Sequence, residues 1–198
     1  MSLGGPRQRS VLAILLLDAN RVVPSERLID LIWGESAPPT AATALQGYVS
    51  QLRKAIEPDR TAPSVIVTAG SGYVARVAPD QLDVSRFEQL VAQGRAAGDP
   101  RGAADAFAEA LALWRGPALS DVRNESFAQE PIRRLEELRI AALEDHADAQ
   151  LALSRHRETV AELEALVAEH PLRERLRGQL MLALYRSGRQ AEALDAFA

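Results

Sequence analysis

Along the first 56 residues, apolar positions return every three or four residues, which is the spacing of one face of an α-helix. The pattern predicts helices over 6–19, over the segment ERLIDLIW, and over 40–56. Ser25 stands at the N-cap position of the second helix, and Gly34 follows its end. Two prolines precede the third helix, and proline is excluded from helix interiors. The pattern therefore predicts three helices, the last two joined by a short turn.

A short β-hairpin is predicted after the third helix. The segment SVIVT at 64–68 is rich in β-branched residues and YVARV at 73–77 alternates, both typical of strands. Gly70, Ser71 and Gly72 stand between them. A phosphate-binding loop is the competing interpretation, but it needs a helix after the glycines, and neither a third glycine nor a Gly-Lys-Ser/Thr run is present. The glycines are therefore interpreted as the hairpin turn, with Gly72 expected at positive φ.

Beyond residue 84 the apolar spacing is helical throughout. Short breaks divide it into helices predicted at 85–97, 101–114, 125–153, 157–169, 173–187 and from near 189 onward. Helices of this length with short turns predict antiparallel pairs. The segments ETVAELEALVAEHP and RQAEALDAFA are similar at a spacing near the 34-residue period of tetratricopeptide repeats. The last pattern is still open at residue 198, so the chain is expected to belong to a longer protein.

Charge also separates two parts of the chain, which APDQ at 78–81 joins. Residues 1–78 hold eight basic and six acidic residues, whereas the remainder holds 15 basic and 21 acidic residues. A mildly basic front and an acidic back indicate two modules with different partners. We therefore predict two domains, one at 1–78 and an all-α one at 83–198.

Composition narrows the possible chemistry. The chain has 198 residues, 47% of them apolar, and no cysteine, which excludes disulfides and thiolate metal sites and fits a cytoplasmic protein. Its longest apolar run is far shorter than the ~20 residues of a membrane span, and no leader peptide precedes it. The three histidines are spread over distant positions, and no Ser-His-Asp set or paired catalytic carboxylates are visible. We expect no enzyme activity, no metal, no cofactor and no membrane partner.

The third helix has two faces of different character. Its apolar face carries Leu45, Val49, Leu52 and Ile56. Its opposite face carries Thr43, Gly47, Ser50 and Lys54, flanked by Gln46 and Gln51. A glycine in a helix interior costs about 1 kcal/mol relative to alanine, which is reasonable where another molecule comes close to the backbone. A solvated surface is the alternative reading of this face. Three helices followed by a hairpin form a winged helix, in which the third helix lies in the DNA major groove.

Several motifs resemble known transcription factors. The run ALQGYVSQLRKAIEP and the segment VTAGSGYVARV resemble the recognition helix and wing of OmpR/PhoB-type effector domains. The whole chain resembles the SARP family, the Streptomyces antibiotic regulatory proteins, through LGGPRQRSVLAILLL, LDVSRFEQLV and ALALWRGPALSDV. The resemblance implies a mainly α protein: a winged helix-turn-helix followed by a tetratricopeptide-like bacterial transcriptional activation domain. Family members carry strands before the first helix, and here only MSLGGP precedes it.

The resemblance also implies roles for individual residues. The positions that face the DNA groove fall on Thr43, Gln46, Gly47, Ser50 and Gln51, and Lys54 is assigned to the same surface. The positions that contact phosphates fall on Trp33, Tyr48, Arg53 and Tyr73. Related wings carry an arginine where this chain has Ala69, and two groove arginines are replaced by Thr43 and Gln51. These departures leave room for water-mediated or shape readout.

The functional expectation is a transcriptional activator that controls secondary-metabolite genes such as those for antibiotics. Its expected partners are double-stranded promoter DNA with direct repeats, a second protomer on that DNA, and RNA polymerase holoenzyme. The alternative is a protein-binding scaffold with a degenerate winged helix and helical repeats.

Overall fold

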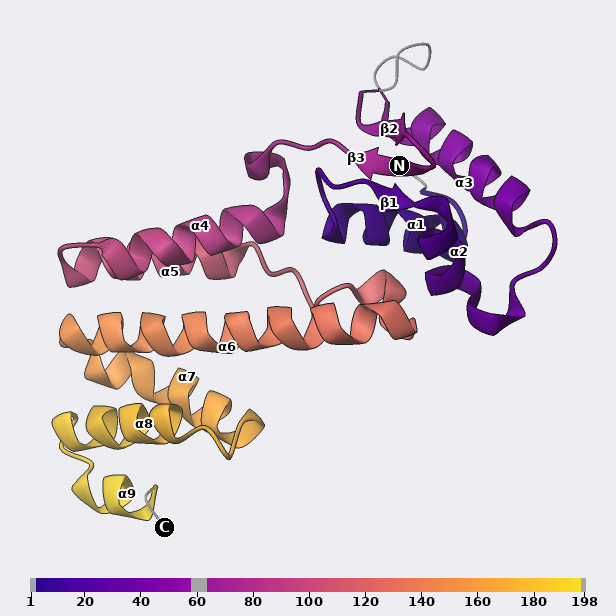
Figure 1. Cartoon of the computed structure of the whole chain (residues 1–198). Helices are drawn as coiled ribbons and strands as arrows, with labels where there is room; N and C mark the ends of the chain where they lie inside the picture. The colour runs from indigo at the N-terminus through magenta and orange to yellow at the C-terminus, as the bar shows by residue number, and fades with distance from the viewer. Residues whose placement is uncertain (1–2, 58–63, 197–198) are drawn as a thin grey trace. The chain divides into compact units, whose positions relative to one another are not determined.

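The structure is a computed structural model that describes residues 3–57 and 64–196. Contacts divide the chain into two compact units, one formed by residues 1–82 and 116–136 and the other by 83–115 and 137–198 (Figure 1). The first is called the winged-helix unit and the second the helical unit. This division differs from the expected boundary at 78–83, because 116–136 packs with the front of the chain: its 3-10 turn Ser120–Val122 contacts α1, and Phe127 packs against the winged-helix core.

The winged-helix unit follows the predicted order of three helices and a hairpin. Its helices are α1 (Pro6–Leu17), α2 (Ser25–Trp33) and α3 (Ala41–Ile56), and its strands are β1 (Val23–Pro24), β2 (Ile66–Ala69) and β3 (Gly72–Ala75). Two short 3-10 turns, Gly34–Ser36 and Pro79–Gln81, follow α2 and β3. The apolar face predicted for α3 is confirmed, since Leu45, Val49 and Leu52 are buried in the core. Residues 58–63, which follow in the sequence, lie outside the described part.

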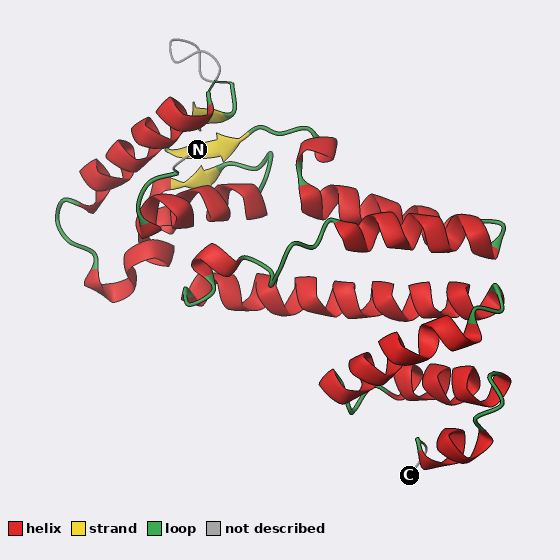
Figure 2. Ribbon diagram, turned by 180° about the vertical axis from the view of Figure 1, so that it is seen from behind, coloured by secondary structure: helices red, strands yellow, loops and turns green. Residues whose placement is uncertain are grey.

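The sheet has three strands in the order β1-β3-β2, all antiparallel (Figure 2). β1 was not predicted, because two residues are too short to show a period. Its pairing also explains why the N-cap role expected for Ser25 is wrong. The residue before the helix is Pro24, which pairs with Gly72 in β3, and Ser25 is already the first residue of α2. The Ser25 N–H instead donates to the Ser71 carbonyl at 3.0 Å.

The two hairpin glycines serve different purposes. Gly70 has φ 56°, the left-handed conformation that a tight turn requires. The positive φ expected for Gly72 is wrong, because Gly72 is an extended strand residue in β3. A Cβ atom at Gly72 would lie 2.1 Å from the Val23 carbonyl oxygen of β1. Glycine is therefore required at 72 by the close approach of a neighbouring strand.

The helical unit contains the paired helices expected from the sequence. They are α4 (Asp83–Ala96), α5 (Pro100–Ala112), α6 (Gln129–Ala152), α7 (His156–Glu169), α8 (Glu174–Arg186) and α9 (Gln190–Asp195), with α6 beginning in the other unit after the 3-10 turn Ser126–Ala128. Within this unit the most extensive helix–helix contacts join α4 to α5, α7 to α8, and α8 to α9 (Figure 1). α4 and α5 approach closely at Gly94, where a Cβ would lie 2.6 Å from the Phe107 ring. Asp99 caps α5 by accepting from the Arg101 and Gly102 N–H groups.

Candidate nucleic-acid interface

The outward face of α3 holds the six residues that the sequence assigned to the DNA groove. All of them are exposed: Thr43, Gln46, Gly47, Ser50, Gln51 and Lys54. The side chains of Thr43, Gln46 and Ser50 have no hydrogen-bond partner among the described residues, and Lys54 has no ion-pair partner there. Burial of Leu45 and the other apolar residues on the opposite side stabilises α3. The polar row therefore lies on one continuous helix.

Gly47 lies in the middle of this face without an internal reason for glycine. A Cβ atom added there would meet no atom of the protein within 4 Å. The backbone at Gly47 is helical, so positive φ does not explain the residue either. This contrasts with Gly72, whose missing side chain is required by its own fold. The open space at Gly47 leaves room for an external surface to approach the helix backbone.

Gln51 is the one member of this row with a described side-chain partner. Its Oε1 accepts a hydrogen bond from Gln8 Nε2 at 2.5 Å. Gln8 in turn accepts the Gly5 N–H at 2.8 Å, which closes the start of α1. The bond therefore places the beginning of α1 next to the middle of α3 and orients the Gln51 amide. A role of Gln51 in base reading would use this amide while it is held by Gln8.

The expected phosphate-contacting residues occupy two clusters. In the first, the Trp33 and Tyr48 rings stack with centroids 6.1 Å apart at an interplanar angle of 15°. The Arg7 guanidinium lies 5.4 Å from the centre of the Trp33 ring, in cation–π range. The indole Nε1 of Trp33 is buried and has no described hydrogen-bond partner. A phosphate contact through this atom would need a movement of the side chains that cover it.

The second cluster joins α3 to the hairpin. Arg53 Nε donates to the Ile66 carbonyl at 2.8 Å, and its Nη2 donates to Thr68 Oγ1 at 2.9 Å. The guanidinium carbon lies 6.0 Å from the centre of the Tyr73 ring. Tyr73 itself is only 9% exposed and belongs to the hydrophobic core. Arg53 is thus committed to contacts within the chain, which the expected phosphate role did not anticipate.

Glu57 is a further residue of this region that sequence reasoning missed. It follows the last residue of α3 and is only 8% exposed. Its carboxylate accepts the N–H groups of Ser64 at 2.8 Å, Val65 at 3.0 Å and Ile66 at 2.7 Å. Burial raises the pKa of Glu57, but these hydrogen bonds outweigh burial and leave the pKa below its ordinary value. The signal available in the sequence was an acidic residue directly after an amphipathic helix.

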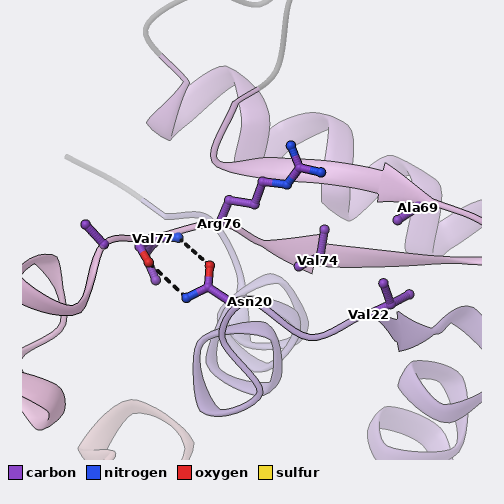
Figure 3. A pocket seen from close by; sticks show the side chains of 7 residues that line it. Asn20, Val22, Ala69, Val74, Arg76 and Val77 are labelled. Carbon is purple, nitrogen blue, oxygen red and sulfur yellow. Dashed lines mark hydrogen bonds between the residues drawn. The ribbon is translucent and has the colours of Figure 1, made fainter.

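A shallow hollow of about 470 Å³ lies beside the three strands (Figure 3). Its lining includes Val22, Ala69 and Val74, with Arg76 at its side. At one end, Asn20 Nδ2 donates to the Val77 carbonyl at 2.9 Å, while the Val77 N–H donates to Asn20 Oδ1 at 3.2 Å (Figure 3). This reciprocal pair fixes the exit of β3 to the end of α1. The hollow lacks the convergent polar groups of a small-molecule site.

Within the described ranges no group of three or more His, Asp or Glu side chains could hold a metal ion. Nor is any described helix long and apolar enough to cross a membrane.

Comparison with known proteins matches both parts of the chain. Residues 3–75 match the family model described as "Transcriptional regulatory protein, C terminal", and residues 82–198 match the "Bacterial transcriptional activator domain". The regulatory protein DnrI of Streptomyces peucetius is 40% identical over 96% of this chain and 74% of its own length. The regulatory protein AfsR of Streptomyces coelicolor is 45% identical over the whole chain, which covers 20% of AfsR.

The chain belongs to the SARP family of transcriptional regulators. The solved structure of Mycobacterium tuberculosis EmbR, in complex with a low-affinity phosphopeptide, matches with a TM-score of 0.93 and 37% identity. The match covers all of this chain and 53% of the EmbR chain. The fold expected from the resemblance, a winged helix-turn-helix followed by a helical activation domain, is therefore confirmed. The chain spans a fifth of the length of AfsR. Membership of the family therefore does not assign the activities of the whole AfsR protein to this chain.

Proposed function

We propose that this SARP-family chain binds double-stranded promoter DNA by laying α3 in the major groove with the β2–β3 hairpin against the adjacent backbone. The observation that carries the proposal is the outward face of α3. It is a row of exposed polar residues with few internal partners, interrupted by Gly47, whose glycine the fold does not need. Major grooves admit an α-helix, and polar side chains on that helix read base edges.

The groove face favours a particular kind of reading. It carries glutamine, serine and threonine, and its one cation is Lys54 near the C-terminal end of α3. Glutamine can form paired hydrogen bonds to adenine, whereas the arginine–guanine pair is unavailable on this face. Specificity then rests on a few direct contacts together with bridging water and DNA shape. Lys54 contributes a phosphate contact of no sequence preference.

Single substitutions separate these roles in a binding assay with salt titration. Lys54→Ala should weaken binding to all sequences about equally and lower the salt slope by about one unit. Ser50→Ala and Gln46→Ala should instead change the preference at single base pairs, seen by selection of bound sequences from a random pool. Tyr73→Phe tests a hydroxyl–phosphate bond and should lose on the order of 1 kcal/mol. If both Lys54→Ala and Ser50→Ala bind like wild type, α3 is not the reading helix.

The activator role is proposed for the helical unit, through contact with RNA polymerase holoenzyme. The support is an exposed apolar surface on α8, where Leu182 is 37% exposed and Tyr185 is 62% exposed. These residues are three apart and share one side of the helix. Exposed aromatic residues are frequent energetic centres of protein interfaces. We propose further that two protomers bind direct repeats about one helical turn apart, at genes for secondary metabolites such as antibiotics.

Transcription in vitro from a two-repeat promoter tests the activator role. Tyr185→Ser combined with Leu182→Ser should leave DNA binding intact and reduce activation. Surface changes are preferable to a truncation at residue 78, because 116–136 packs with the winged-helix unit and would be lost. Full activation by the double variant would remove the α8 surface from the proposal. Footprints that never extend over two repeats would remove the second protomer.

A further inference from the structure

β2 is an edge strand whose outer side is covered by side chains of α3. In the ladder, the Arg76 N–H donates to the Val65 carbonyl at 2.7 Å, so the backbone groups of the next residue, Ile66, point away from β3. Backbone N–H and C=O groups on the free edge of a strand need hydrogen-bond partners. The Ile66 N–H donates to Glu57 Oε1 at 2.7 Å, and the Ile66 carbonyl accepts from Arg53 Nε at 2.8 Å. The side chains of Arg53, in the last turn of α3, and of Glu57, directly after it, thus replace a missing strand at one residue.

Arg53 and Glu57 extend this grip in opposite directions along the hairpin. Arg53 stands in the last turn of α3 and Glu57 directly after its last residue, and both side chains reach the same residue, Ile66. Arg53 continues forward to Thr68 Oγ1 at 2.9 Å and lies over the Tyr73 ring. Glu57 continues backward to the N–H groups of Ser64 and Val65. The strand is therefore held from 64 to 68 by a helix that precedes it in the chain.

The chemistry of both residues is specific to this task. A carboxylate offers two oxygens, and Glu57 uses both, with Oε1 toward Ile66 and Oε2 toward Ser64. Glutamine keeps only one acceptor oxygen at that place. The planar guanidinium of Arg53 donates from two nitrogens at once, which the single ammonium of lysine does not reproduce. Together the two groups fix the distance between the end of α3 and the hairpin.

We propose that Arg53 and Glu57 are positioning residues that lock the hairpin to α3, so that groove face and wing meet DNA as one preformed body. The inference rests on the proposed function for its consequence in DNA binding. A hairpin that is already fixed to α3 does not have to be ordered when DNA binds, so binding costs less conformational entropy than it would with a loose hairpin. Arg53 then acts through Thr68 and Tyr73 on the placement of the wing. This differs from the direct phosphate contact that family resemblance suggested.

Hydrogen exchange of the full chain tests the lock without DNA. Glu57→Gln and Arg53→Met should each accelerate exchange at the Ile66 amide and along the hairpin at least tenfold, while α1 and the helical unit exchange as in wild type. Arg76→Met is the matched control, because it removes a hairpin arginine that has no described side-chain partner. Unchanged hairpin exchange in both lock variants would overturn the proposal.

DNA binding supplies the second test, with a selected high-affinity duplex and a version shortened on the side that the hairpin protects in a footprint. Glu57→Gln should bind the full duplex about tenfold more weakly. This is the opposite of what charge alone predicts, because the variant loses a negative charge that would repel DNA. The deficit should disappear on the short duplex, and Arg53→Met should behave alike.

Three outcomes separate the explanations. Tighter binding by Glu57→Gln refutes the lock. A deficit of Arg53→Met that persists on the short duplex, with a smaller salt slope, identifies a direct phosphate contact and also refutes it. A double variant of Arg53→Met with Tyr73→Phe that loses no more than the worse single variant supports action through Tyr73. If the wild-type chain binds neither duplex, the proposed function fails, and hydrogen exchange alone decides the lock.

Discussion

In the winged-helix unit, the polar row on the outward side of α3 has few partners within the described residues, whereas in the helical unit polar side chains of neighbouring helices are largely paired with one another. Asp145 of α6 accepts from Arg95 of α4 at 2.7 Å and from Arg175 of α8 at 2.7 Å. Arg175 also reaches Asp148 at 2.7 Å. Three helices of the helical unit are therefore joined by one chain of charges.

A second part of this network is nearly inaccessible to solvent. The Glu144 side chain is 6% exposed and accepts two bonds from Arg173, each 3.1 Å long. Hydrogen bonds to Glu144 and Glu137 raise the pKa of Arg173 above its ordinary value. Gln179 donates to the Glu144 backbone carbonyl at 2.7 Å. Charges at these positions hold α6 against α8.

The difference shows how to interpret polar residues in each unit. Charged side chains that satisfy one another stabilise a fold and leave little for a ligand. Exposed polar side chains on a rigid helix, with no internal partner, are available to an external molecule. The same distinction applies to the glycines, since Gly72 and Gly94 are required by close internal contacts and Gly47 is not. The predictions below test this distinction in order of decreasing expected effect.

The largest effect is expected for Gly72→Val. The new Cβ would overlap the Val23 carbonyl, so β1 and β3 must separate, and the winged-helix unit should lose about 3 kcal/mol or more of unfolding free energy. Hydrogen exchange at increasing denaturant concentration measures the loss of unfolding free energy in each unit. Gly70→Ala is the control, because it adds a Cβ in open space at positive φ and should cost only about 1 kcal/mol. Equal losses for both variants would contradict the contact-based explanation.

In the helical unit, Glu144→Gln should have the next largest effect. The change leaves Arg173 without one of its two carboxylate partners in a site that solvent scarcely reaches, and should lower the unfolding free energy by about 2 kcal/mol. Thermal unfolding measures it. Glu109→Gln is the matched control in the same unit, since its carboxylate pairs with Arg86 at the surface and should matter by less than about 0.5 kcal/mol. A Glu144→Gln variant as stable as wild type would show that the network does not hold α6 to α8.

Gly47→Ala should stabilise the fold and weaken DNA binding at once. The helix gains about 1 kcal/mol because alanine is the better helix former and no atom obstructs its methyl group. The same methyl group should lower affinity for selected DNA about tenfold if the backbone closely approaches the duplex. Gly178→Ala is the control, as another helix-interior glycine in open space, on α8. It should stabilise similarly and leave DNA affinity unchanged. Wild-type affinity in Gly47→Ala would refute the close approach.

The smallest effect near neutral pH concerns the acid dependence of Glu57. Its pKa in the folded chain lies below the ordinary value of 4.5, so its contribution to stability is complete above that value and is lost as pH falls through the folded pKa. The winged-helix unit should therefore weaken on acidification. Glu57→Gln should flatten that dependence and be less stable than wild type at neutral pH. Denaturation at a series of pH values checks the sign, and a parallel decline in both proteins would exclude Glu57 as the cause.

The sequence predicted the helices and the exposed polar face of α3 well for a simple physical reason. Leu45, Val49 and Leu52 repeat with the helical period, so the buried side of α3 and hence its exposed polar side can be found without a structure. The hairpin was also found, because β-branched segments flank Gly70 and Gly72. The groove-facing and phosphate-contacting roles of individual residues stay predictions.

Only the tertiary structure revealed the contacts between residues far apart in the chain. Val23 pairs with Tyr73 across fifty positions, and that pairing is why Gly72 must be glycine. Arg53 and Glu57 bind the backbone of Ile66, which lies 13 and nine positions further along the chain, and Phe127 packs on a core built from the first 75 residues. The spacing of apolar residues shows which face of a helix or strand is buried, but not which distant backbone group packs against that face. Such long-range contacts depend on the tertiary fold of the whole chain.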